Sequence, residues 1–209
     1  MLVLLILSQL LLPRIAASVI SSRLGRYGKV RSVSVSVWPA IRLLWGSVGS
    51  VTVKAESLSM QPEQASKLLW EAKGTGDAHI SVERVQVGSL QLTDATLDKQ
   101  GSVLVAHATA TEAAVKAALP ENFAVRLLRS EAGEVEVQAS GALFGVGASV
   151  NAVAEASEGK LVAHPLGFLL EGFRLTLFSS PHVYVEGVGA RVLAQQPLSY
   201  RLTMTGRVR

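Results

Sequence analysis

The amino-acid sequence predicts a mostly β protein of the α+β class, in which a curved antiparallel sheet is accompanied by few helices. Three observations support this fold class. Beyond residue 30 the apolar residues recur with a period of two, short turn signals separate the alternating stretches, and only two helical patterns interrupt them. A period of two is typical of strands that bury one face.

The clearest strand pattern is residues 32–37, which read SVSVSV and place three valines on one face and three serines on the other. Strands joined by short turns must pair antiparallel, because a parallel crossover needs about a dozen residues or more. Further alternating stretches are 48–55, 80–87, 90–97, 102–108, 134–139, 146–154, 173–178, 182–188 and 198–208.

Two short helices are expected within this β-rich body. Pro62 suits a first helical position, and an apolar stripe follows it until Gly74. The second helix is expected to begin at Thr109, where Glu112 completes a capping-box spacing, and to run to Pro120. A curved sheet with so few helices needs a cover for its apolar face, which a second sheet, a helix in its concavity or a ligand could provide.

The N-terminal segment indicates export or a membrane anchor. Residues 1–12 read MLVLLILSQLLL, and Pro13-Arg14 follows. Twelve helical residues rise about 18 Å, which is short of a hydrocarbon core of about 30 Å but suits a signal peptide. We therefore interpret residues 1–13 as a signal peptide, with a weak cleavage site at residues 15–17, or as an uncleaved anchor. Residues 14–209 then form a single extracytoplasmic domain; the alternative is a buried N-terminal helix.

An amphipathic helix is expected to continue from this segment and to end near residues 25–28. Such a helix either lies on a bilayer or packs into a curved sheet. Its polar side carries serines and arginines. Its apolar stripe consists of Ala16, Val19, Ile20, Leu24 and Tyr27.

The net charge of +4 hides an asymmetry along the chain. Before Glu56 there are seven basic and no acidic residues, whereas the remainder has 13 basic and 16 acidic residues, a balance of −3. Basic residues beside a membrane anchor gain roughly 1 kcal/mol each from anionic lipid. The charge therefore favours a membrane surface over nucleic acid as a partner, although solvated charges on one helix are the simpler interpretation.

Nothing in the sequence nominates a catalytic group. Cysteine is absent, the four histidines lack metal-ligand spacing, and no nucleophile elbow, phosphate-binding loop or dinucleotide fingerprint occurs. Basic residues without interleaved aromatics argue against single-stranded nucleic-acid binding. We expect neither an enzyme nor a cofactor or metal site.

Large apolar residues stand where connections are expected. Trp38 precedes a proline that ends the first strand, and a short apolar turn follows it. A second such stretch, residues 165–170, is expected to form a loop. Loops normally run over the wet surface. These residues either cap the end of the core, or touch a membrane or line the mouth of an acyl-chain cavity.

The order of these segments resembles the LmeA-like phospholipid-binding proteins of bacterial cell envelopes, over roughly residues 10–206. The resemblance rests on four segments: LLLPRIAASVISSRLGRYG, VSVSVWPAIRLLWG, SVTVKAESL and TEAAVKAAL. Trp38 departs from the family pattern, where phenylalanine is usual, and so does the basic stretch 23–31. The resemblance implies a curved antiparallel sheet wrapped around a long N-terminal helix, an apolar groove between them, and phospholipid binding in the envelope.

Three hypotheses follow. The first is a non-enzymatic phospholipid-binding or lipid-transfer protein, the second a structural envelope module that binds another protein through its sheet, and the third a lipid hydrolase with a serine and a carboxylate beside a histidine. For the first, headgroup or membrane contacts are expected from Arg23, Arg26 and Arg31. Acyl-chain contacts are expected from Trp38, Ile41, Leu44, Trp45, Phe144 and Phe168.

Overall fold

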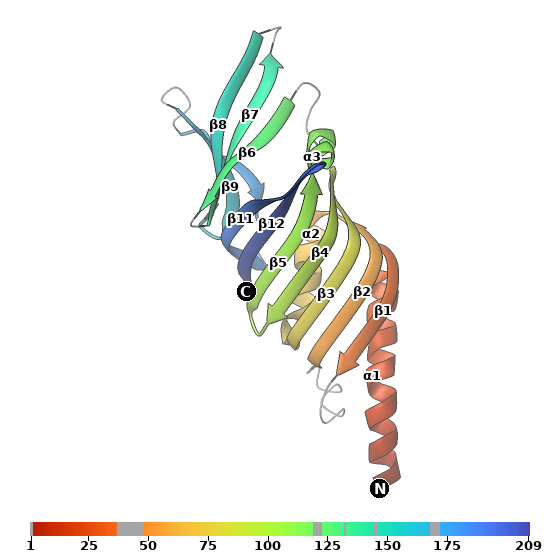
Figure 1. Ribbon diagram of the computed structural model, residues 1–209. Coiled ribbons are helices and arrows are strands. Elements are labelled where there is room, and N and C mark those ends of the chain that lie inside the picture. Colours follow the sequence, from red (N-terminus) through yellow and green to blue (C-terminus); the bar gives the residue numbers. More distant parts are fainter. Residues whose placement is uncertain (1, 37–47, 119–122, 132, 144–145, 168–171) are drawn as a thin grey trace.

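The computed structural model describes residues 2–36, 48–118, 123–131, 133–143, 146–167 and 172–209. Strands dominate this part of the chain, and they form one sheet of seven strands and one of five (Figure 1). Three α-helices accompany them among the described residues. The predicted fold class, α+β with mostly antiparallel strands and an N-terminal helix, is confirmed.

The seven-stranded sheet has the order β1-β2-β3-β4-β5-β12-β11. Five of these strands belong to the first half of the chain and two to its C-terminus, so the last hairpin, β11–β12, returns to pair beside β5. Their bounds are β1 (Gly28–Ser36), β2 (Val48–Met60), β3 (Thr75–Val87), β4 (Leu90–Gln100), β5 (Val103–Thr111), β11 (Val183–Gln195) and β12 (Leu198–Val208).

One pair in this sheet is parallel, unlike the uniformly antiparallel pairing that the short turns predict. Strands β2 and β3 run in the same direction, with Val53 opposite Ile80. The crossover between them is helix α2 (Pro62–Glu71) and the 3-10 turn η2 (Ala72–Gly74). The predicted helix at Pro62 is thus confirmed, and it supplies the length that a parallel connection requires.

The five-stranded sheet has the order β10-β9-β8-β7-β6, with every pair antiparallel. Strand β11 passes the turn ends of this sheet: Val188 N donates to the carbonyl of Gly133 at 3.3 Å and Val185 N to that of Gly159 at 3.0 Å. The bounds are β6 (Phe123–Glu131), β7 (Glu134–Leu143), β8 (Val146–Ser157), β9 (Lys160–Leu166) and β10 (Leu175–Phe178).

Helix α1 (Leu2–Leu24) is continuous through Pro13. Its C-terminal half packs on Val35, Val51 and Val53 of β1 and β2 through four side chains: Ala16, Ala17, Ile20 and Leu24. Three of the predicted stripe residues therefore face the sheet, and Tyr27 packs on the neighbouring cluster. Val19 differs, because its side chain is 50% exposed and Ala17 takes its place at the sheet.

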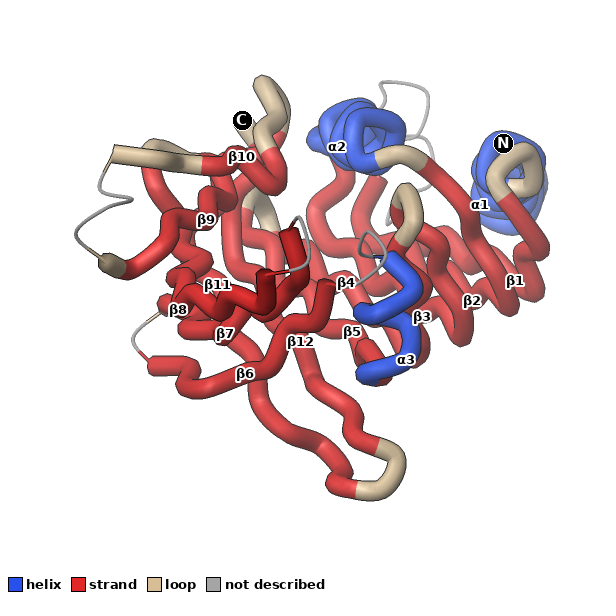
Figure 2. Tube along the Cα trace, turned by 90° about the horizontal axis from the view of Figure 1, so that it is seen from above, coloured by secondary structure: helices blue, strands red, loops and turns tan. Residues whose placement is uncertain are grey.

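Helix α2 lies on the same face of the seven-stranded sheet as α1 (Figure 2). Its Leu69 packs on the buried cluster of Leu104, Val183 and Val208. The two helices therefore cover different parts of one apolar sheet face, α1 over the β1–β2 end and α2 farther along.

The third helix, α3 (Glu112–Ala118), begins three residues later than predicted. Thr111, not Thr109, is its cap: the Thr111 Oγ1 accepts a hydrogen bond from Ala114 N at 3.1 Å. Thr109 belongs to β5, where it pairs with Arg201 of β12. The predicted loop at residues 165–170 is also wrong at its start, because Pro165 and Leu166 are the last residues of β9.

Candidate functional site

The covered face of the seven-stranded sheet is apolar from one edge to the other. Its register aligns one residue from each strand in a row, and every member of the row is apolar: Val33, Val53, Ile80, Leu97, Ala106, Met204 and Val188. Because side chains two apart along a strand share a face, the rows on either side of this one point the same way. The sheet thus offers an apolar floor beneath α1 and α2.

A charged side chain also lies on this otherwise apolar sheet face. In the adjacent row Lys99 lies between Ala78 of β3 and Leu104 of β5, and its side chain is only 1% exposed. Its amine donates a hydrogen bond to the Thr75 carbonyl, at the point where the α2–η2 crossover enters β3. Burial lowers the pKa of this amine, and the Asp77 carboxylate opposes the shift.

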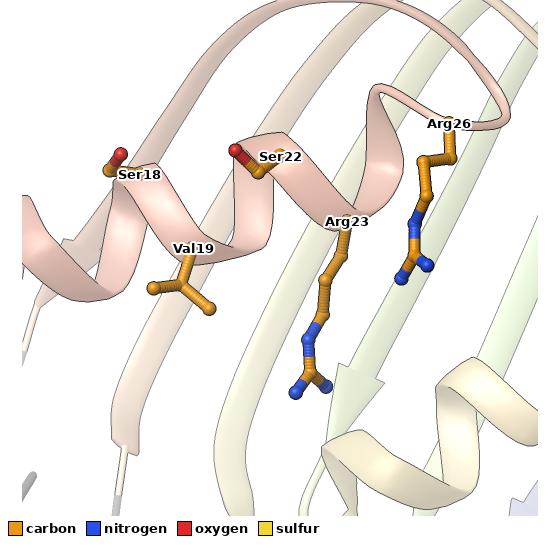
Figure 3. A pocket seen from close by; sticks show the side chains of 5 residues that line it. All are labelled: Ser18, Val19, Ser22, Arg23 and Arg26. Carbon is orange, nitrogen blue, oxygen red and sulfur yellow. The ribbon is translucent and has the colours of Figure 1, made fainter.

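A shallow surface hollow of about 290 Å³ lies along the exposed side of α1. It is lined by Ser18, Val19, Ser22, Arg23 and Arg26 (Figure 3), and we call it the α1 hollow. Residues three and four apart are neighbours on a helix surface, so Ser18 and Ser22 follow one another along α1, as do Val19, Arg23 and Arg26. Figure 3 shows Val19 and both arginines directed to the same side of the helix.

Arg23 reaches from the α1 hollow to the other helix. Its Nη1 atom lies 3.4 Å from Oε2 of Glu71, the last residue of α2. Both side chains are substantially exposed, and an exposed ion pair of this kind contributes about 0–1 kcal/mol. The contact therefore positions the Arg23 guanidinium between α1 and α2 and leaves it available to a competing anion.

Arg26 differs from Arg23 in its surroundings. Within the described part of the chain no carboxylate lies within 4.0 Å of the Arg26 guanidinium. Its positive charge is therefore not compensated by a direct ion pair there. The α1 hollow consequently combines one bridged and one uncompensated arginine.

Arg31, the third predicted headgroup contact, does not join this site. Its Nη1 lies 3.0 Å from Oε1 of Glu83, and Glu56 accepts ion pairs from Lys29 at 2.9 Å and Arg84 at 3.0 Å. The hydrogen bond and charge of Lys29 are the largest cause of the lowered pKa of the Glu56 carboxyl. Glu56 and Glu83 follow the buried Ala55 and Val82 and so point to the opposite face of the sheet.

The six residues predicted to contact acyl chains all lie outside the described residues: Trp38, Ile41, Leu44, Trp45, Phe144 and Phe168. Their role stays a prediction. Four residues that the sequence analysis did not propose as site residues line the hollow or lie on the apolar sheet face: Ser18, Val19, Ser22 and Lys99. For the two serines a signal existed, because they share the polar side of the predicted helix with Arg23 and Arg26.

The histidines of the described part do not assemble a hydrolytic site. His79 Nδ1 lies 2.6 Å from Asp98 Oδ1, His164 Nε2 lies 3.5 Å from Glu155 Oε1, and the His182 ring stacks on Trp70 at 5.0 Å. The fourth histidine, His107, places its Nδ1 3.0 Å from the Thr203 hydroxyl oxygen, and in the described part of the chain none of these rings contacts both a hydroxyl and a carboxylate. No group of three or more metal-ligating side chains occurs among the described residues.

Comparison with known proteins identifies a family. A family model described as LmeA-like phospholipid-binding matches residues 3–206, which is nearly the whole chain. A search of curated proteins and a search of solved structures returned no match. Among the described helices, none combines the length and the apolar character that crossing a membrane requires.

Proposed function

Because the chain belongs to the LmeA-like phospholipid-binding family, we propose that it is a non-enzymatic phospholipid-binding protein of the cell envelope that carries lipid outside the cytoplasm. The observation that carries this proposal is the α1 hollow, in which hydroxyls and guanidinium groups line the exposed side of a helix whose other side packs on an apolar sheet face. An anionic headgroup suits the hollow, and acyl chains suit the floor.

Headgroup binding would use the two arginines of the hollow in different ways. Guanidinium groups bind phosphate oxygens through charge-assisted, often bidentate hydrogen bonds. The Arg26 guanidinium is available for this without breaking an ion pair within the described residues. Arg23 would exchange the Glu71 carboxylate for the phosphate, and the serine hydroxyls would donate the remaining hydrogen bonds.

Acyl chains would gain their binding energy from the apolar row of the sheet. Each methylene removed from water contributes about 0.8 kcal/mol. The row crosses all seven strands, and α1 and α2 each cover part of it. A chain that enters between the helices therefore meets Val, Leu and Ile side chains in place of water.

The test is native mass spectrometry of the gently purified protein, together with sedimentation on vesicles of phosphatidylcholine and phosphatidylglycerol. We expect co-purified phospholipid in the parent and roughly thirtyfold weaker binding of anionic lipid in the R23A/R26A double variant, since each of the two charges contributes about 1 kcal/mol near a membrane surface. The matched control is R191A, an exposed arginine of β11. A parent protein that is free of lipid and does not sediment with either vesicle contradicts the proposal.

A second function is favoured by one observation on the other sheet. The segment that enters and forms edge strand β10 exposes alternate apolar side chains, with Phe173 64%, Leu175 54% and Leu177 49% exposed. Contiguous exposed apolar residues often mark protein interfaces. An envelope module that binds another protein through this edge would lose its partner in an F173S/L175S variant and would keep lipid binding unchanged.

A further inference from the structure

We infer that α1 is both a membrane anchor and a wall of the lipid site. Because its N-terminal half is inserted in the bilayer, the α1 hollow is held at a fixed height above the membrane surface. The inference uses the proposed lipid binding only to name the cargo. Insertion of α1 is measurable without any cargo.

The first observation is that the predicted anchor and the hollow belong to one helix. Helix α1 runs without a break from Leu2 to Leu24, and it extends past the ends of β1 and β2 (Figure 1). Its first half is the apolar run of residues 2–12, and its second half lines the hollow and packs on the sheet. A change in the position of one half therefore moves the other.

The second observation concerns cleavage. Processing at the weak site after Ala17 would remove Ala16 and Ala17, which pack on the buried valines of β1 and β2. It would leave Ser18–Leu24, about two helical turns, and isolated helices shorter than about 12 residues are marginal in water. The packing of α1 therefore requires the helix to be retained, which favours an anchor over a cleaved signal peptide.

The third observation is the order of charges along the helix. The apolar run ends at Pro13-Arg14, and six more basic residues, among them Arg23 and Arg26 of the hollow, follow before any acidic residue occurs. Such a segment suits an anionic bilayer, with the apolar run in the hydrocarbon and Arg14 among the headgroups. Ile15 and Val19, which are 57% and 50% exposed, then lie at the interface.

Helix geometry places the hollow relative to the headgroups. At 1.5 Å per residue, Ser18 lies about 6 Å and Arg23 about 14 Å along the axis from Arg14. The first distance is comparable with a headgroup layer of about 5–8 Å, and the second is about twice that thickness. A phospholipid of the anchoring leaflet therefore needs to rise by about one headgroup layer to reach Ser18 and by about two to reach Arg23. The membrane that holds α1 is accordingly the one that exchanges lipid with this site.

The experiment uses the full chain, which contains no cysteine, so that single-cysteine variants take one fluorescent label each. L4C, I15C and the distant V192C are labelled with an environment-sensitive dye and mixed with vesicles of phosphatidylcholine and phosphatidylglycerol. We expect the label at position 4 to be quenched by lipids brominated deep in the acyl chains, and that at position 15 by lipids quenching near the headgroup. The label at position 192 should not respond.

Equal shallow quenching at positions 4 and 15, or a label at position 4 that stays in water, overturns the inference. Intact mass of the protein recovered from cell membranes tests retention: a chain that starts at Ser18 overturns it as well. The L4R/L7R double variant separates this inference from the proposed function. It should leave the vesicles and still carry phospholipid in native mass spectrometry, whereas loss of lipid from the parent would contradict only the proposed function.

Discussion

Lys99 carries an amine on a sheet face whose other members are apolar, and its environment makes its protonation sensitive to folding. Its pKa is lowered by burial, whereas an unfolded lysine has a pKa of about 10.4. Between the lowered value and about 10.4 the unfolded chain binds more protons than the folded chain. The free energy of unfolding therefore rises with pH across this interval, and below it the cost of burying the charge is fully present.

We predict that K99M removes this rise. At pH 7 the variant gains by no longer burying a charge, but it leaves the Thr75 carbonyl without its donor, which costs about 1–3 kcal/mol. The net change should therefore be small, under about 2 kcal/mol. The raised pKa of the Tyr200 hydroxyl acts in the opposite direction at high pH. The comparison of variant with parent isolates Lys99.

Urea unfolding between pH 7 and 10.5 measures this difference. The control is K67M, which changes an exposed lysine of α2 and should keep the slope of the parent. An unchanged slope in K99M would mean that the amine is not desolvated in the folded protein.

At the scale of elements, one of the contacts between the two sheets is made by a turn residue. Gly159 connects β8 to β9 with a φ of +77°, and its carbonyl accepts the hydrogen bond of Val185 N. A Cβ atom at this position would overlap the ring of Tyr184. The guanidinium of Arg209 also lies over the Tyr184 ring, 4.4 Å from the ring centroid, so the turn, β11 and the C-terminus meet here.

We predict that G159A lowers the free energy of unfolding by about 2–4 kcal/mol, because it adds a steric overlap to the strain of a positive φ. The chain offers a matched control in G101A. Gly101 has a φ of +57° in the β4–β5 turn, and a Cβ there would meet no atom within 4 Å. That variant should lose only the strain, about 1 kcal/mol. Thermal or urea unfolding of both variants gives the comparison, and equal losses would show that the overlap is relieved by movement of Tyr184.

The elements that the sequence predicts well are those with unbroken alternation, and the missed ones have a local cause. Strand β6 contains adjacent Leu127 and Leu128 at a register shift, which hides its period of two. Strand β9 contains Pro165 next to its last residue, and a proline there is typical of a loop. It is tolerated because β10 pairs only with residues 161–163 of β9.

The predicted strand ends also differ from the observed ones where the alternation of buried and exposed residues is interrupted. In β2 the buried residues are Ala55 and then Leu58, a step of three, and in β4 a register shift lies between Thr93 and Thr96. Alternation fails at such irregularities, which bend a sheet. The pattern at 48–55 therefore stops short of the real strand end at Met60.

At the scale of the whole molecule, the location of the candidate site was partly predictable. The apolar stripe and the arginines of residues 14–31 are visible in the sequence, but the side of α1 that faces the sheet is chosen by packing, which is why Val19 lies in the hollow. The burial of Lys99 could not be predicted, because it depends on the pairing of β3, β4 and β5. The spacing of Arg23 and Arg31 in the sequence also does not reveal that their side chains lie at separate places, Arg23 beside Glu71 and Arg31 beside Glu83.

The separation of Arg31 from Arg23 reduces the attraction of the N-terminal basic residues to an anionic surface. The sequence has seven basic residues before its first acidic one, yet Lys29 and Arg31 are paired with Glu56 and Glu83, and Arg23 with Glu71. Paired charges attract an anionic surface less than uncompensated ones do. The attraction available to the folded protein is therefore smaller than composition indicates, and Arg26 carries a larger share of it than Arg31.

We predict that R26A weakens sedimentation with phosphatidylglycerol vesicles several-fold, by about 1 kcal/mol, whereas R31A, which removes the same formal charge, changes it less. Salt should weaken the binding of the parent, since the Debye length falls from about 30 Å at 0.01 M to about 8 Å at 0.15 M. The difference between the two variants should shrink with it. Binding to phosphatidylcholine vesicles is the control, and neither variant should alter it. If R26A and R31A weaken anionic binding equally at low salt, the ion pairs of Arg31 do not survive at the membrane, and net charge alone determines attraction.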